Sequence, residues 1–371
     1  MSAPPRVSWP QALAWRLGRH LLDPVGDVAA ADVVRRLGAV PAASDAALAV
    51  RSRQSPTRRD AAGPDEIPRA LADGNLLAVY AFRGATHLVT PEDGGAYLAL
   101  RAAGRMWERS SWREYYRLEP DDWPALRAAV RDALSSGPLT RAELGDAVAR
   151  DPAYAHLRAA FADPSHTFLK PFGWQGDLSF GPSRGQEPTF QRLDTHPRWR
   201  PWPDLDEAGH HALLHYVGTY GPVTEANAHY WLGEGLGAGR ARIRRWWAEL
   251  ADRFVEVDID GEPRVVLHDD TESLAAAVPS TAVRLLPGHD QWVLGPGTAD
   301  PHVVPAAHRQ AVSRGANLVV AGGTVAGTWA LAGDEAAITW FGDPAPSDTV
   351  SAEVARLGAA LDRPLRAGAR S

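Results

Sequence analysis

Two groups of arginines are the feature of this sequence with the clearest chemical potential. The first group comprises Arg240, Arg242, Arg244 and Arg245, and the second comprises Arg51, Arg53, Arg58 and Arg59. A guanidinium is always charged and binds phosphate through two hydrogen bonds, so either group could contact a nucleic-acid backbone. The alternative for the first group is a solvated helix face, and the residues favour neither. For the second group an exposed loop is the commoner outcome.

Histidines and carboxylates supply the other candidates for catalysis or metal binding. His211 and His215 lie one helical turn apart, but the glutamate of the zinc-protease motif is missing. We therefore expect a structural pair and no metal site. His289 and Asp290 stand together in a polar segment and could act as a general acid–base pair. The alternative is a turn in which both side chains bond only to the backbone.

Composition limits the possible chemistry. At 371 residues the chain is too long for one small module and predicts two or three domains. It has no cysteine, which excludes disulfides, thiolate zinc sites, cysteine-held iron–sulfur clusters and cysteine nucleophiles. The net charge of -6 does not indicate a nucleic-acid binder, so only clustered arginines count as evidence. Lys170 is the only lysine among 39 basic residues, a bias typical of a G+C-rich genome.

Two segments of similar sequence predict helix-turn-helix units. Residues 137–144 and 221–228 each place a Gly-Pro turn before a threonine that can cap a helix. Thr140 is followed by Glu143, which completes a capping box, whereas Thr224 lacks that glutamate. The preceding helices are expected at 123–134 and 207–220. A helix, a tight turn and a capped second helix are typical of helix-turn-helix and winged-helix folds.

The hairpins that would complete winged helices follow these segments. After the later copy we expect a helix over 240–250 and a hairpin of 254–259 and 264–267, turning at Asp260 and Gly261. After the earlier copy we expect short strands at 167–170, 176–180 and 189–193. A further unit precedes both, with helices over 27–36 and 45–52 and a hairpin of 76–82 and 86–90. Residues 55–65 and 181–188 are expected to be loops.

Beyond about residue 283 the sequence predicts mainly strands. They are expected at 284–286, 291–294, 317–320, 324–331 and 337–341, before a final helix over 351–360. The fold class is therefore α+β, with three tandem winged-helix units and a β-rich C-terminal domain. The expected boundaries are 1–120, 121–205, 206–280 and 281–371.

Five stretches of the chain resemble the AlkZ-like family of winged-helix DNA glycosylases, which includes the bacterial YcaQ group. They are ADVVRRLGAV (31–40), FRGATHLVTPED (82–93), GPVT (221–224), LLPGHDQWVLG (285–295) and GTVAGTW (323–329). Each is weakly specific alone, but together they span nearly the whole chain in the expected order. The resemblance implies a C-shaped arrangement with a concave channel for duplex DNA. His289 and Gln291 in the fourth stretch become candidate DNA contacts.

The resemblance also implies an activity. Members resemble monofunctional glycosylases that excise bulky alkylpurine adducts and unhook interstrand crosslinks, often as self-resistance in antibiotic producers. Such an enzyme is a monomer that needs neither metal nor organic cofactor. Hydrophobic runs shorter than a membrane span and the absence of a secretory signal indicate a cytoplasmic, nucleoid-associated protein.

One departure from the family pattern concerns catalysis. The family carries Gln-x-Gln or Gln-x-Asp after the leucine-glycine turn, and those side chains hold the hydrolytic water. Here Pro41 and Ala43 occupy the matching positions, and neither can hold or deprotonate water. Ser44 or Asp45 could substitute, although an aspartate at a helix start is usually a cap.

The sequence is therefore consistent with three functions. The first is a glycosylase that hydrolyses the N-glycosidic bond of an N7- or N3-alkylated purine. The second is a non-catalytic protein that binds adducted DNA or sequesters a DNA-damaging natural product, and the missing glutamines favour it. The third, a transcription regulator, fits less well because three different units do not provide two-fold half-site recognition.

Overall fold

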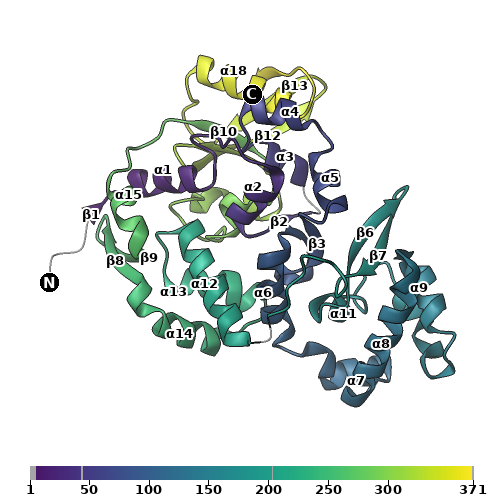
Figure 1. Ribbon diagram of the computed structural model, residues 1–371. Helices are drawn as coiled ribbons and strands as arrows, with labels where there is room; N and C mark the ends of the chain where they lie inside the picture. The colour runs from purple at the N-terminus through teal and green to yellow at the C-terminus, as the bar shows by residue number, and fades with distance from the viewer. Residues whose placement is uncertain (1–5, 43–44, 203, 370–371) are drawn as a thin grey trace.

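The computed structural model describes residues 6–42, 45–202 and 204–369. Within these residues the chain forms four β-sheets, three of three strands and one of five strands. Helices accompany each small sheet, and the five-stranded sheet lies at the C-terminal end of the chain (Figure 1). The fold is thus mixed α and β.

The first small sheet is antiparallel, in the order β2 (Val40–Pro41), β4 (Thr86–Val89) and β3 (Leu77–Tyr80). Its helices are α2 (Ala30–Leu37), α3 (Ala46–Arg51), α4 (Pro56–Ala62), α5 (Glu66–Ala72) and α6 (Pro91–Ala102). Val40 and Leu88 pack with Val33 and Val34 of α2 in one apolar cluster. The apolar contact of Val40 with Val33 and Val34 of α2 stabilises the position of the two-residue strand β2.

The second small sheet has the order β5 (Leu139–Thr140), β7 (Glu187–Arg192) and β6 (Leu178–Arg184). Its helices are α7 (Ser110–Tyr116), α8 (Trp123–Ala133), α9 (Arg141–Val148), α10 (Arg158–Ala162) and α11 (Lys170–Trp174). The predicted capping box of Thr140 and Glu143 is confirmed at the start of α9. Strands β6 and β7 form a hairpin whose tip projects from the body (Figure 1).

The third small sheet joins the N-terminal end of the chain to a distant hairpin. β1 (Arg6–Val7) runs parallel to β8 (Phe254–Ile259), which pairs with β9 (Glu262–Leu267). Its helices are α12 (Leu205–Tyr220), α13 (Glu225–Ala228) and α14 (Arg240–Glu249), with a π-helical stretch over His229–Glu234 between the last two. Thr224 caps α13 in a box completed by Asn227 in place of a glutamate.

The five-stranded sheet runs in sequence order from β10 to β14. Its strands are β10 (Val283–Leu286), β11 (Asn317–Ala321), β12 (Thr324–Ala332), β13 (Glu335–Trp340) and β14 (Arg366–Ala369). Helices α16 (Gln291–Leu294), α17 (Arg309–Ser313) and α18 (Ser347–Ala360) belong to the same part of the chain. Strand β14 pairs parallel to β13, whereas the other pairs are antiparallel.

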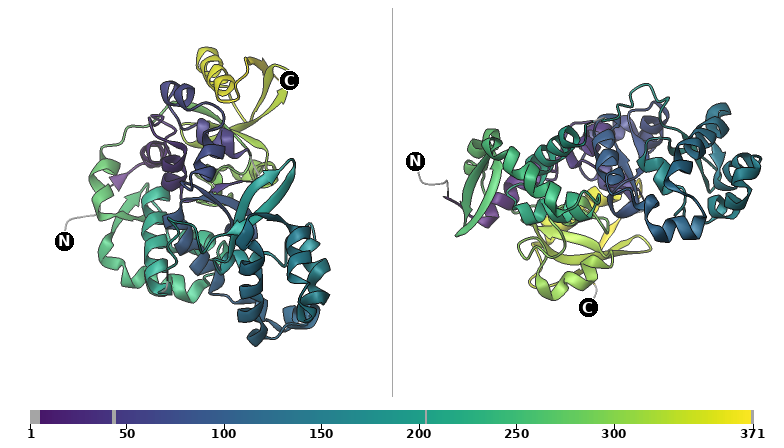
Figure 2. Two further views of the ribbon diagram at one scale, coloured as in Figure 1. Left: turned by 45° about the vertical axis from the view of Figure 1, so that its right-hand side comes forward. Right: turned by 90° about the horizontal axis from the view of Figure 1, so that it is seen from below.

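Helix α1 (Trp9–Arg19) packs between the third sheet and the five-stranded sheet (Figure 2). Trp9 and Trp15 join the cluster of β8 and β9, with α15 (Thr271–Ala275) beside it. Leu13 and Leu17, on another face, join the cluster of the C-terminal sheet. Segments from both ends of the sequence therefore share their cores.

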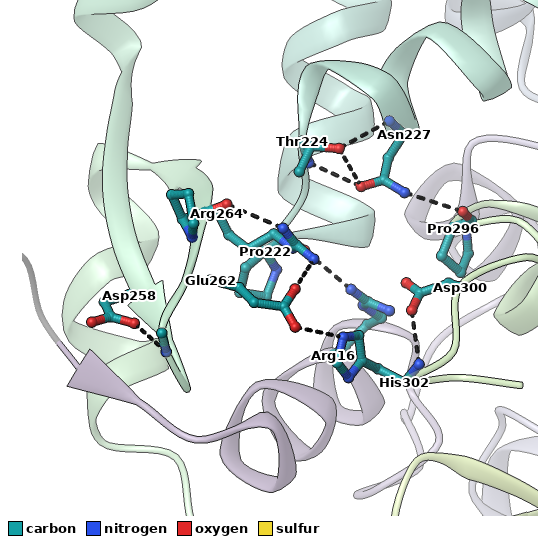
Figure 3. Close-up of polar contacts among 12 residues, drawn as sticks. Arg16, Pro222, Thr224, Asn227, Asp258, Glu262, Arg264, Pro296, Asp300 and His302 are labelled. Carbon is teal, nitrogen blue, oxygen red and sulfur yellow. Dashed lines mark hydrogen bonds and ion pairs between the residues drawn. The ribbon is translucent and has the colours of Figure 1, made fainter. Parts of the chain in front are cut away.

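Polar contacts reinforce this junction (Figure 3). The Arg16 guanidinium donates hydrogen bonds to the carbonyls of Gly221 and Pro222, both at 3.3 Å. Beside it, Glu262 of β9 contacts His302 at 3.1 Å. The Gly-Pro turn singled out in the sequence is thus bound by the N-terminal helix.

Four local predictions are wrong. Residues 291–294 form the helix α16 because Asp290 caps it through the Trp292 N–H. Residues 167–169 form a turn that leads into α11 at Lys170, where a strand over 167–170 was expected. Residues 56–62 form α4, capped by Ser55, and the segment 181–188 continues β6 and β7. Of the described helices, none is both long enough and apolar enough to span a membrane.

Candidate nucleic-acid interface

The turn that follows α2 is held in place by side chains from α12. The Thr219 hydroxyl donates to the carbonyl of Arg36 at 3.1 Å, and the Tyr220 hydroxyl donates to the carbonyl of Leu37 at 2.9 Å. These bonds satisfy carbonyls that a helix end leaves without partners. Gly38 then reverses the chain with a φ of 80°, a conformation that favours glycine. The path into β2 is therefore fixed.

Pro41 lies in β2, paired with His87 of β4. It is buried, and a proline side chain has neither a donor nor an acceptor with which to hold water. The structure thus offers no substitute at this first position of the family pattern. Ala43 and Ser44, the other positions in question, lie outside the described residues.

Asp45 stands at the start of α3 and is exposed to solvent. Its carboxylate accepts a hydrogen bond from the Leu48 N–H at 2.9 Å, which is the geometry of a helix cap. The expected capping role is confirmed. A carboxylate in this position is also accessible to a ligand.

His87 is a residue that the sequence analysis did not single out. It is buried beside Pro41, and its Nδ1 lies 3.0 Å from the carbonyl of Ala85. Burial lowers the pKa of His87 to about 4, so the ring is neutral at pH 7. The sequence signal that could have identified His87 is its position within the FRGATHLV stretch, which resembles the family.

The second arginine group is largely committed to internal contacts. Arg51 donates to the carbonyl of Ala360 at 2.7 Å and to the carboxylate of Asp362 at 2.6 Å. The Arg53 and Asp290 side chains are both 0% exposed and form two hydrogen bonds, at 2.7 and 2.9 Å. A guanidinium sealed in this way cannot reach a phosphate. The prediction that Arg51 and Arg53 contact DNA is therefore wrong. Both residues instead join the region of α3 to the C-terminal part of the chain.

The other two members of this group are also held. Arg58 pairs with Glu66, which itself accepts from the Ala30 N–H at the start of α2. The Arg59 side chain is only 3% exposed and faces Asp60 at 4.0 Å. Arg59 is thus buried, whereas Arg58 keeps partial access to solvent. The expected loop is a packed helix, which explains why these arginines are ordered.

The first arginine group does lie on one helix, α14. Arg244 and Arg245 are paired with carboxylates, at 3.9 Å to Glu225 for the former and with Asp206 for the latter. Arg240 and Arg242 have no carboxylate partner among the described residues. Arg242 donates to the carbonyl of Ala238 at 2.9 Å. Arg240 and Arg242 are therefore the arginines of α14 without a carboxylate partner among the described residues.

The polar stretch near residue 290 divides into buried and exposed members. Asp290 is buried and accepts from Arg53 and from the Trp292 N–H, so it is corrected from a candidate acid or base to a structural residue. Gln291 is buried and bonded to the Tyr220 hydroxyl at 3.0 Å, which removes it from the candidate DNA contacts. His289 is exposed, with a positive φ of 57°.

Three cations that have no carboxylate partner within the described residues come from three separate segments of the chain. Arg83, in the β3–β4 turn, stacks over Tyr230 with its guanidinium carbon 4.7 Å from the ring centre. Arg101 of α6 lies 4.4 Å above the ring of Trp174. A Cβ built on Gly84, the residue after Arg83, would lie 3.6 Å from the Arg101 guanidinium and 3.8 Å from the Lys170 amine. The sequence separates these residues, so their proximity was not predicted. In the sequence, the only signal among them is that Lys170 is the single lysine of the chain.

The histidine pair of α12 has local partners. His211 Nε2 lies 2.9 Å from Asp93, and His215 Nδ1 lies 2.8 Å from the Tyr97 hydroxyl. Across the described ranges, histidines and carboxylates form no group of three that could hold a metal. The pair acts as a link between α12 and α6.

Comparison with known proteins places the chain in a family. The sequence model of the DNA glycosylase AlkZ-like family matches residues 15–366. A curated relative from Streptomyces sahachiroi, named interstrand DNA cross-link repair glycosylase, is 35% identical over 365 residues, covering 96% of this chain and 97% of the relative. The solved structure named Streptomyces sahachiroi DNA glycosylase AlkZ aligns with a TM-score of 0.89 and 34% identity. That alignment covers 98% of this chain and 100% of the solved chain.

This protein therefore belongs to the AlkZ-like DNA glycosylase family. The resemblance inferred from the five sequence stretches is confirmed, and the fold is that of the solved relative.

Proposed function

We propose that this protein is a DNA glycosylase that acts on bulky alkylpurine adducts and interstrand crosslinks in duplex DNA. The observation that carries the proposal is the match over nearly the whole chain to a relative named as an interstrand cross-link repair glycosylase. The unpaired cations Arg240 and Arg242 support it, because a DNA ligand would supply the missing negative charge.

The proposed architecture has three winged-helix units and a β-rich C-terminal domain, bounded at residues 120, 205 and 280. Each small sheet with its helices would be one unit, and the units would form a C-shaped body around a concave channel. The β6–β7 hairpin, which projects from the body in Figure 1, would border this channel. Helix α14 would contact the phosphates.

The proposed chemistry requires little of the protein. An N7- or N3-alkylated purine is already a cation, so it leaves as a neutral base once the C1′–N bond weakens. The protein must stabilise the positive charge that develops on the sugar and supply a nucleophile to C1′. The exposed carboxylate of Asp45 is one candidate for activating a water molecule.

The direct experiment is a single-turnover incubation with a duplex that carries one N7-alkylguanine, followed by alkaline cleavage at abasic sites. Strand cleavage at the adduct is the expected result. A duplex with unmodified guanine at the same position is the matched control, and binding is titrated in parallel. Tight binding to the adduct without any abasic product would contradict glycosylase activity.

That contrary result would support the second candidate, a non-catalytic protein that binds adducted DNA or sequesters a DNA-damaging natural product. Pro41 favours it, because the family's first water-holding side chain is replaced by one without polar atoms. Under either function the protein would serve in self-resistance or DNA repair.

A further inference from the structure

The segment between α2 and α3 is held at its first end through Tyr220 of α12. The Tyr220 hydroxyl donates to the carbonyl of Leu37, the last residue of α2, at 2.9 Å, and it also lies 3.0 Å from the side-chain amide of Gln291. A phenol has one proton to donate, and a backbone carbonyl can only accept. The proton therefore goes to Leu37, and Gln291 turns an amide N–H toward the hydroxyl oxygen. A chain of two hydrogen bonds thus runs from α16 to the end of α2.

The ring of Tyr220 is packed on two sides, which fixes where its hydroxyl lies. His20 meets the ring edge-on, with ring centres 5.1 Å apart, and a Cβ built on Gly295 would lie 1.9 Å from a ring carbon. The turn itself is packed as closely, since a Cβ built on Gly38 would lie 2.7 Å from the Tyr97 hydroxyl. Close-packed interiors transmit displacements because they leave little empty space to absorb them. A shift of the Tyr220 hydroxyl is therefore passed to the turn.

The far end of the same segment is held by Asp290, which precedes Gln291 in the chain. Arg53 donates to both Asp290 carboxylate oxygens, at 2.7 and 2.9 Å, and to the carbonyl of Ala49 in α3 at 2.7 Å. Two consecutive residues of the C-terminal part are thus linked, each through one intervening side chain, to a backbone carbonyl on either side of the segment. That segment ends at Asp45, the candidate for activating water.

We propose that Tyr220 and Gln291 are positioning residues, which set the place of the segment between α2 and α3 beside the damaged nucleotide and thereby control the rate of base release. The inference rests on the proposed function, since it assumes that base release occurs beside this segment. Both residues are 1% exposed, so they act through the Leu37 carbonyl and not by touching DNA. The reaction remains hydrolysis by water, because these hydrogen bonds transfer no proton to the substrate. We call Gln291, Tyr220 and the Leu37 carbonyl the Tyr220 relay.

Loss of the Tyr220 relay should slow base release more than it weakens binding. A reacting group displaced by about 1 Å can lose about 100-fold in rate. Binding depends instead mainly on cations at the surface, such as Arg240, whereas the relay is buried. We expect Tyr220→Phe to lower the single-turnover rate of base release by about 10- to 100-fold. The Kd for a duplex that carries N7-alkylguanine should stay within about twofold of wild type.

Tyr216→Phe is the matched control for this variant. Tyr216 is also buried in α12, and its hydroxyl donates to a backbone carbonyl, that of Gly295, at 3.0 Å. Each variant therefore removes one phenolic oxygen and leaves one buried carbonyl without that donor, which should lower stability by a similar amount. Tyr216→Phe should release base at the wild-type rate, because its hydroxyl bond leads to the end of α16 and not to the end of α2. An equal loss of rate in the two variants overturns the proposal.

Gln291→Leu tests the other bond of the Tyr220 relay. It removes the donor to Tyr220 but leaves the Tyr220 hydroxyl bonded to Leu37, so the rate should fall less, by about threefold to tenfold. Combined with Tyr220→Phe it should add no further loss, since both changes act through one hydroxyl. Losses that multiply in the double variant overturn the relay. Circular dichroism checks the fold of each variant, and Gln291→Leu carries the test if Tyr220→Phe does not fold.

Amide hydrogen exchange provides a readout that does not need activity. Peptides covering residues 38–50 should exchange faster in Tyr220→Phe than in wild type or Tyr216→Phe, because the end of α2 is less firmly held. Base release by Tyr220→Phe at the wild-type rate overturns the positioning role and leaves the glycosylase standing. If the wild type releases no base, the glycosylase is contradicted. Faster exchange in Tyr220→Phe then upholds the relay, and unchanged exchange overturns it.

Discussion

At the scale of single residues, the type of a side chain proved a poor guide to its role. Arg53 and Asp290 were both candidates for function, yet they form one buried ion pair across 237 residues of sequence. The sequence alone does not show whether the partner of a charged side chain is DNA or another side chain of the protein. The Asp45 cap was predictable, because a capping bond is local and spans three residues.

The role of Asp45 is tested by Asp45→Asn, since asparagine caps helices as well as aspartate does. We expect the free energy of unfolding to be unchanged and the rate of base release to stay within about threefold of wild type, because the Asp45 carboxylate is already engaged as the cap of α3. Single-turnover kinetics and urea unfolding measure the two quantities. A loss of about 100-fold in rate at unchanged stability would instead assign the carboxylate as the general base.

His87 predicts a pH dependence of stability. Its pKa is about 4 in the folded protein against about 6.5 when unfolded, so between these values the unfolded chain binds more protons. The stability from the neutral ring is complete above pH 6.5 and is lost as pH falls toward 4. We expect His87→Asn to reduce the proton uptake on unfolding in this window by up to about one, as measured by urea unfolding at several pH values. Equal uptake in both proteins would contradict a neutral His87.

At the scale of elements, predictions succeeded where the signal repeats along the chain. Helix α12 and the β8–β9 hairpin follow from apolar periodicity and from the turn at Asp260 and Gly261. Predictions of short elements were less successful. Residues 291–294 are apolar enough for a strand, but they form a helix that Asp290 caps through the Trp292 N–H. The Asp290 carboxylate is itself held by the distant Arg53, which the local sequence does not reveal.

Helix α14 gives a prediction that compares two pairs on one element. Arg240→Gln with Arg242→Gln removes free cations, so duplex affinity should fall and the slope of log K against log salt should decrease by about two. Arg244→Gln with Arg245→Gln removes cations that already have carboxylate partners and should change the slope less. Fluorescence anisotropy at several salt concentrations measures both. Equal effects would show that ion pairing does not select the contacts.

At the scale of the whole molecule, the candidate site is assembled from three distant stretches of sequence. The Arg83 N–H, in the β3–β4 turn, donates to the carbonyl of Gly235, just after the π-helix, at 2.6 Å. A Cβ built on Gly84, in the same turn, would lie 3.8 Å from the amine of Lys170 in α11. Sequence patterns report on neighbours along the chain, so this proximity could not be predicted. The family resemblance predicted the mixed α and β fold that the solved relative shares but, at Pro41, not the chemistry.

The buried pair of Arg53 and Asp290 joins the first sheet's helices to the C-terminal part and predicts a large effect on stability. Asp290→Asn leaves the Arg53 charge buried without a counter-charge, so unfolding should become easier by about 3 to 5 kcal/mol. Urea unfolding measures the change. Asp334→Asn, at the exposed pair with Arg363, is the control and should have little effect. A small change for Asp290→Asn would mean that water reaches Arg53.

The bonds from Arg51 to the carbonyls of Ala359 and Ala360 bear on how the chain is synthesised. A ribosome releases α3 about 300 residues before it releases these acceptors, so the segment that carries the turn after α2 leaves the exit tunnel without its final partners. Its guanidinium therefore lacks these two acceptors until residues 359 and 360 have been translated. A message truncated before those codons would thus yield a protein altered at α3.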